Sequence, residues 1–300
     1  MSLKNRFLFL LIVALTIGSF IVHAQAEVDV LNYDIWLEPD IQQKSIEGKA
    51  VIDFKLPPDV KTVRFRCGNL TIERVTGYYI GEFEVEDGQL TIAITHETSN
   101  LLYRVTIDYH GKPKSGLFFN TERNEAYTVY ATSNWMPCTN TLRDKATISM
   151  NLLLPNDVKC VASGELQESI PIANKTLHVW KQYYETPPYT YGFAVGDFNE
   201  FTEIEDDVTL HYFAQHHTVD ELKSIFKETP KMIRFFENKT GLHYPQTTYS
   251  QVLIGNHYQE MSGFAVLKNT YGNLALKDST ETNLFSHELA HQWYGNLVTM

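Results

Sequence analysis

The stretch that decides the fold lies near the end of the sequence, where residues 283–296 read NLFSHELAHQWYGN. At its centre is His287-Glu288-Leu289-Ala290-His291, and residues at positions i and i+4 of an α-helix lie on the same face. Both imidazoles can therefore reach one tetrahedral zinc ion. Glu288 borders that face, which predicts that it takes a proton from a zinc-bound water rather than binding the metal.

Two histidines do not complete such a site, because a zinc hydrolase usually has three protein ligands and one open position. The alternative is an ordinary surface helix with solvated histidines and Glu288 in an ion pair. None of the remaining histidines is an obvious third ligand; those considered are His211, His216, His217, His243 and His257.

The residues before this stretch predict mixed helices and strands. Thr218 and Glu221 form a capping box that opens a helix, which Pro230 should split and Gly241 should end. A partly internal strand is expected at residues 248–254, and the metal-binding helix is expected to run from Asp278 to Trp293.

From residue 27 to about 200 the pattern is instead that of strands with period-two alternation, separated by turns. Such runs favour an antiparallel β sandwich or saddle-shaped sheet. The change of pattern near residue 203 predicts a β domain at residues 27–203 and a second domain at 204–300, hence a multi-domain α+β fold. The alternating runs are centred on Ala50–Phe54, Val63–Cys67, Val105–Tyr109 and Ile148–Leu152.

Composition excludes some classes of function. The chain has 300 residues, 43% of them hydrophobic, and a net charge of −11, which would repel a phosphate backbone. Nucleic-acid binding is therefore not expected. Cys67, Cys138 and Cys160 have no metal or redox spacing and are predicted to be buried thiols.

The N-terminus has the pattern of a secretory signal peptide. Lys4 and Arg6 precede an apolar run at residues 7–22, and Ala24-Gln25-Ala26 has the small-x-small pattern of a cleavage site. The run is too short for a typical membrane span. The mature protein is expected to begin near Glu27, outside the cytoplasm (secreted or periplasmic), without a membrane anchor.

Together these motifs resemble the aminopeptidase N-type zinc aminopeptidases, along essentially all of the expected mature chain. The resemblance implies a thermolysin-like α/β catalytic domain of the gluzincin class after the β domain, a Zn²⁺ cofactor, and peptide substrates with a free N-terminus. The matching stretches are residues 33–40, 48–52, 135–138 with 144–146, 191–198, 235–245 and above all 287–296.

The resemblance also implies a third zinc ligand, a glutamate 19 positions after His291, near position 310. The transition-state tyrosine of the family lies further on. The sequence ends at Met300, so the 300 residues are expected to be an incomplete, inactive piece that binds zinc poorly.

In the same family a glutamate before the zinc helix holds the α-amine of the substrate. By resemblance Glu260, in the stretch YQEMSGF, is the candidate for this role, although the Glu-Met order is reversed relative to the family. Gly263 would let a substrate backbone lie close to the strand. Asn134 is a weak candidate for a second amine contact, and Asn140 replaces an acid of the family motif.

We therefore predict a zinc aminopeptidase that uses a zinc-activated water. A zinc endopeptidase remains an alternative, because the His-Glu-x-x-His pattern alone does not choose between the two. A non-catalytic β-rich binding or scaffold module is a third.

Overall fold

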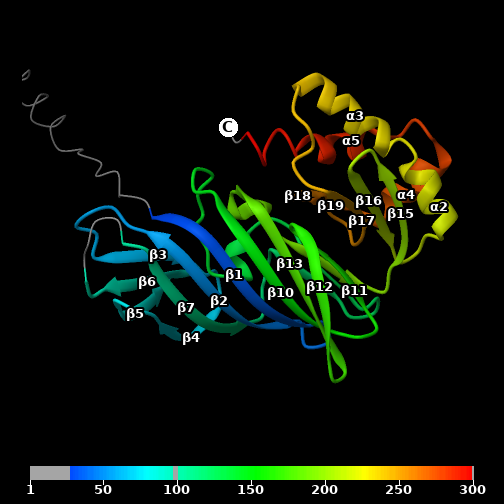
Figure 1. Cartoon of the computed structure of the whole chain (residues 1–300). Coiled ribbons are helices and arrows are strands. Elements are labelled where there is room, and N and C mark those ends of the chain that lie inside the picture. Colours follow the sequence, from blue (N-terminus) through cyan, green and yellow to red (C-terminus); the bar gives the residue numbers. More distant parts are fainter. Residues whose placement is uncertain (1–27, 97–100, 299–300) are drawn as a thin grey trace, which may run out of the picture.

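The computed structural model describes residues 28–96 and 101–298 (Figure 1). The predicted signal peptide, residues 1–26, lies outside the described residues. Within the described ranges, none of the helices has the length and apolar character needed to cross a bilayer.

The N-terminal part is built from three sheets (Figure 1). The largest has seven strands, in the order β12 (Glu165–Ile172), β13 (Lys175–Thr186), β10 (Ala146–Pro155), β1 (Asp29–Asp40), β2 (Ser45–Lys55), β7 (Tyr103–Gly111) and β4 (Thr71–Thr76). The second has β11 (Lys159–Ala162), β14 (Phe193–Gly196), β9 (Glu125–Thr128) and β8 (Leu117–Asn120). The third has β3 (Thr62–Arg66), β6 (Gln89–Ile94) and β5 (Ile80–Glu86).

The period-two pattern has the expected cause, because alternate residues of these strands face one shared core. In β2, Ala50, Ile52 and Phe54 are fully buried, whereas the residues between them are not. One pairing differs from the expected antiparallel arrangement: β1 and β10 are parallel, with Tyr33 opposite Ile148. The three cysteines are free and buried, as predicted.

The C-terminal part has a mixed five-stranded sheet. Its order is β15 (Asn199–Glu205), β16 (Val208–Ala214), β17 (Thr248–Leu253), β19 (Phe264–Leu267) and β18 (Gln259–Met261). The predicted boundary at residue 203 falls inside β15. The helices are α2 (Val219–Phe226), α3 (Thr229–Thr240), α4 (Asn269–Lys277) and α5 (Asn283–Ala290), with two short 3₁₀ turns, η1 (Thr132–Asn134) and η2 (Pro188–Thr190), in the β part.

This sheet is buried on both faces. Leu210, Tyr249 and Leu253 pack in one core with the helices α2, α3 and α5. Val252 and Val266, on the opposite face, belong to the core of the β part. The β part therefore forms one wall of the second sheet, which explains why β17 is apolar on both faces.

The helical predictions are mostly confirmed. Pro230 lies in the first turn of α3 and separates it from α2, and Gly241 ends α3 with a φ of 71°. The helix predicted from Asp278 to Trp293 is wrong at its start. Asp278 caps the end of α4, its side chain binds the backbone and hydroxyl of Thr280, and α5 begins only at Asn283.

The capping box of α2 gives a testable contribution to stability. The hydroxyl of Thr218 accepts the N–H of Glu221, and the Glu221 carboxylate accepts the N–H of Thr218. Thr218→Ala is expected to lower the free energy of unfolding by about 1 kcal/mol, since the helix loses a partner for its first N–H groups. Urea unfolding measures the effect. Thr218→Ser should retain most of the stability, and an equal loss in both variants would contradict the capping role.

Glu200 predicts a pH dependence of stability. His211 Nδ1 donates to its carboxylate at 3.3 Å and Lys159 Nζ at 3.2 Å, and these contacts lower the pKa of Glu200 from 4.5 to about 2. Because the pKa is lower in the folded state, the stabilisation is present above pH 4.5 and is lost as the pH falls towards 2. The difference in unfolding free energy between wild type and Glu200→Gln should therefore shrink between pH 5.5 and pH 3. A constant difference would contradict this prediction.

Candidate active site

The two histidines of the metal-binding pattern face one another at the end of α5. His287 lies in the last turn, and His291 follows as the C-cap residue with helical backbone angles (φ −60°, ψ −21°). Their spacing of one helical turn brings His287 Nε2 to 3.2 Å from His291 Nε2. Two atoms bound at about 2.05 Å to a tetrahedral zinc ion are about 3.4 Å apart, so this pair has the geometry of two zinc ligands.

The tautomer of His291 also suits a metal ligand. The Nδ1–H group donates to the backbone carbonyl of Tyr294 at 3.0 Å, which leaves Nε2 with its lone pair directed at His287. A hydrogen bond of this kind fixes both the ring orientation and the atom that is free to bind. The donor set thus fits a zinc ion held by His287 and His291, with further ligands to be supplied from elsewhere.

Glu288 is buried beside this pair, with 4% of its surface exposed. Burial and, as the smaller cause, the negative charge of Glu260 together raise the pKa of its carboxyl from 4.5 to about 7. The burial of Glu288 argues against the alternative in which α5 is an ordinary surface helix and Glu288 forms an exposed ion pair. A carboxyl group with such a pKa can both accept and return a proton near neutral pH.

Glu260 belongs to the same cluster although it lies on another element. It sits on β18, the edge strand of the five-stranded sheet, with 8% exposure. A carboxylate oxygen of Glu260, a carboxylate oxygen of Glu288 and a ring nitrogen of His291 all lie within 4.8 Å of one another. Glu260 Oε1 is 3.9 Å from His291 Nδ1. The structure therefore brings together four of the five predicted site residues.

A glutamine of the helical stretch fixes the distance between β18 and α5. Gln292 donates to the carbonyl of Met261 at 2.9 Å and accepts the N–H of Gly263 at 3.0 Å. Asn296 in turn donates to the same Gln292 oxygen at 3.1 Å. These buried bonds hold the strand of Glu260 against the helix of Glu288.

Comparison with known proteins agrees with this geometry. The Peptidase family M1 domain matches residues 225–300. Aminopeptidase 2 of Candida albicans is 22% identical over 91% of the chain and 32% of its own length. Glutamyl aminopeptidase of Bitis rhinoceros is 24% identical, also over 91% of the chain and 32% of its own length. The chain thus spans about a third of the length of these curated relatives.

The fold is also that of solved M1 enzymes. A two-domain M1 zinc metallopeptidase, crystallised as a mutant bound to L-arginine, has a TM-score of 0.78 at 18% identity. The match covers 91% of the chain and 66% of the solved one. An M1 zinc metallopeptidase from Deinococcus radiodurans also gives 0.78 at 18% identity, over 92% of the chain and 66% of its own.

The C-terminal part of the chain, residues 225–300, thus resembles an M1 peptidase domain, and the described residues share the fold of solved M1 zinc metallopeptidases. The predicted closeness of a substrate backbone to Gly263 stays a prediction, and the structure shows what the glycine itself does. Gly263 makes the turn between β18 and β19 with a φ of +86°, its N–H is bound by Gln292, and its carbonyl accepts the N–H of Ser250 at 3.0 Å. Its N–H is thus not free to pair with a substrate backbone, and glycine serves the turn itself.

Neither of the two asparagines considered from the sequence belongs to the cluster of ligand atoms formed by Glu260, Glu288 and His291. Asn134 donates to the hydroxyl of Ser115 at 2.7 Å, on η1. Asn140 is exposed. In the same segment, Asp144 binds the backbone of Val30 and the hydroxyl of Thr139, a buried network that holds β1 in place. The Pro-Cys motif therefore has a structural role here, as the sequence suggested.

The sequence did not point to Gln259, Gln292 or two tyrosines near the candidate site. Tyr130 follows β9 and Tyr189 lies in η2. Burial, and after it the charge of Glu260, raises the pKa of both phenols. The sequence held one signal for the two glutamines: Gln259 directly precedes Glu260, and Gln292 directly follows His291. The tyrosines gave no signal, because their approach depends on the tertiary fold.

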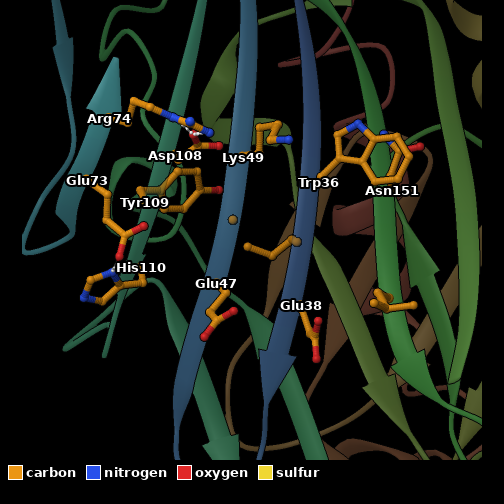
Figure 2. Close-up of a pocket in the computed structure, with 13 residues that line it drawn as sticks. Trp36, Glu38, Glu47, Lys49, Glu73, Arg74, Asp108, Tyr109, His110 and Asn151 are labelled. Atoms are coloured by element: carbon orange, nitrogen blue, oxygen red, sulfur yellow. Dashed lines mark hydrogen bonds and ion pairs between the residues drawn. The ribbon is translucent and has the colours of Figure 1, made fainter. Parts of the chain in front are cut away.

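The candidate active site is distinct from the hollow of about 700 Å³ on the seven-stranded sheet (Figure 2). The charged side chains there are partly paired with one another: Arg74 binds Asp108 at 2.6 Å, and His110 lies 2.9 Å from Glu73. Trp36 also lines the hollow and is 45% exposed. None of the predicted site residues lines it.

Proposed function

We propose that the protein expressed from its complete gene is a zinc-dependent aminopeptidase, which removes N-terminal residues from peptides. The observation that carries this proposal is the cluster of His287, Glu288, His291 and Glu260, in which an acid from the neighbouring strand lies beside the metal-binding pair. The names of the relatives support the same activity.

Each of these side chains has a distinct chemical task in the proposal. His287 and His291 would hold the zinc ion, which when bound supplies a polarising charge for the peptide carbonyl and lowers the pKa of a water molecule. The Glu288 carboxylate accepts the proton of the attacking water and then delivers it to the leaving amine. Its burial beside Glu260 keeps it near the pKa that such a two-way transfer requires.

Glu260 distinguishes an aminopeptidase from an endopeptidase in this proposal. A protonated α-amine carries a positive charge that a buried carboxylate binds well, whereas an internal peptide bond offers none. Because Glu260 is within 4.8 Å of the other ligand atoms, an amine held there places the first peptide bond beside His291 and Glu288. Substrates without a free N-terminus would leave Glu260 unpaired and bind less well.

The remaining features complete the proposal. A secreted or periplasmic location is proposed from the pattern of residues 1–26, and residues 27–203 and 204–300 are proposed as the β domain and the first part of the catalytic domain.

The test is hydrolysis of leucyl- and alanyl-p-nitroanilide by the complete gene product, with N-acetyl-leucyl-p-nitroanilide as the blocked control. We expect cleavage of the two free-amine substrates only, and loss of that cleavage after chelation with recovery when zinc is added. Equal cleavage of the acetylated substrate would support an endopeptidase instead. An inactive, zinc-loaded protein would support a binding module.

A further inference from the structure

The side chain of Gln259 connects two separate loops of the β part to the candidate active site. It is 1% exposed and lies on β18, directly before Glu260. Its Oε1 accepts the backbone N–H of Tyr130, and its Nε2 donates to the backbone carbonyl of Tyr189 at 3.1 Å. One amide thus fixes the position of two aromatic residues that are 59 positions apart in the chain, next to the carboxylate proposed to bind the amine.

The loop that carries Tyr130 is strained in a way that needs such a support. Tyr130 and Ala131 are consecutive non-glycine residues with φ values of 46° and 42°. A left-handed backbone at two adjacent residues costs free energy and persists only where its surroundings hold it. Strain of this kind commonly accompanies a functional side chain. Here it leaves Tyr130 with 53% of its surface exposed.

Both tyrosines lie close to the acidic cluster. Burial and, as smaller causes, the charges of Glu260 and Glu288 raise the pKa of the Tyr130 phenol, and burial followed by the charge of Glu260 raises that of Tyr189. Tyr189 is also tied to the segment after α5, because its hydroxyl donates to the carbonyl of Gly295 at 3.3 Å. The backbones of Tyr130 and Tyr189 are thus both anchored on Gln259, one residue before Glu260, and the Tyr189 hydroxyl lies at Gly295, four residues after His291.

We infer that Gln259 is a positioning residue that holds Tyr130 and Tyr189 as an aromatic seat for a large apolar or aromatic N-terminal side chain. This inference rests on the proposed aminopeptidase function. Glu260 binds the amine, so the side chain on the adjacent carbon meets the phenol rings. Aromatic rings attract apolar and aromatic groups by contact and by ring–ring packing. An acidic side chain would be repelled by Glu260 and Glu288.

The activity test compares phenylalanyl- and alanyl-p-nitroanilide with the complete gene product. Wild type is expected to prefer the phenylalanyl substrate in kcat/KM by about tenfold or more. Gln259→Leu, which removes both amide bonds, should reduce that preference by about tenfold, mainly by raising KM for the phenylalanyl substrate. Gln259→Glu keeps an acceptor for the N–H of Tyr130 and should therefore keep part of the preference for the phenylalanyl substrate. Tyr258→Ala, in the neighbouring exposed tyrosine, is the matched control.

Binding without metal separates this inference from the proposed function. We expect metal-free wild-type protein to bind L-phenylalaninamide about tenfold more tightly than L-alaninamide by isothermal titration calorimetry, and Tyr130→Ala to remove the difference. In the binding test, equal affinities for the two amides or a preference for argininamide would overturn the aromatic seat. In the kinetic test, an equal loss of kcat/KM for both substrates in Gln259→Leu would also overturn it. Absence of hydrolysis with an intact binding preference would instead overturn the proposed aminopeptidase.

Discussion

Replacing Glu288 by glutamine in the complete gene product is expected to lower kcat for leucyl-p-nitroanilide by about 10²–10⁴-fold. The amide has nearly the same shape as the carboxyl but cannot take the proton of the attacking water. Because Glu288 is buried and His287 and His291 are unchanged, the zinc content should stay at the wild-type level. Steady-state kinetics and metal analysis of the same sample measure both quantities.

The matched control for this change is Glu168→Gln, at an exposed position of β12. It removes the same charge from the protein and should leave kcat within about twofold of wild type, since a surface substitution of this kind rarely matters. If Glu288→Gln kept more than a tenth of the wild-type kcat, a different group would have to move the proton.

The second large effect concerns the metal. His287→Ala should weaken zinc binding by more than about 100-fold, because loss of even an outer-shell partner costs 10–100-fold and His287 is proposed to bind the ion directly. The affinity can be measured by competition with a chromophoric chelator. His243→Ala removes a side chain that is 98% exposed and should leave the affinity unchanged. Equal affinities in the two variants would show that zinc is bound elsewhere.

Local patterns predicted much of this molecule. The spacing of His287 and His291 was enough to place both rings on one helical face, and the capping box at Thr218 was confirmed atom by atom. Period-two alternation identified strands such as β2 because a sheet with one buried face imposes it on the residues themselves. These features depend on neighbours in sequence, which is why one sequence is sufficient to find them.

The errors and omissions have the opposite origin. Helix α5 starts at Asn283 rather than Asp278 because the Asp278 side chain binds Thr280 and ends the preceding helix, so two starts were plausible from sequence alone. The bond between the Gly263 N–H and Gln292 joins residues 29 positions apart and could not be foreseen from local pattern. The backbone N–H of Tyr130 donates to Gln259 across 129 residues of chain, a contact that no local pattern indicates.

The burial of the second sheet on both faces limits how the protein can be divided. A cut near residue 203 would uncover side chains that are now less than 7% exposed, and an uncovered apolar face of that size favours aggregation. The C-terminal half therefore depends on the β part to cover this face, and it is not expected to fold as an independent module. The affected side chains are Phe213, Val252, Ile254, Met261, Phe264 and Val266.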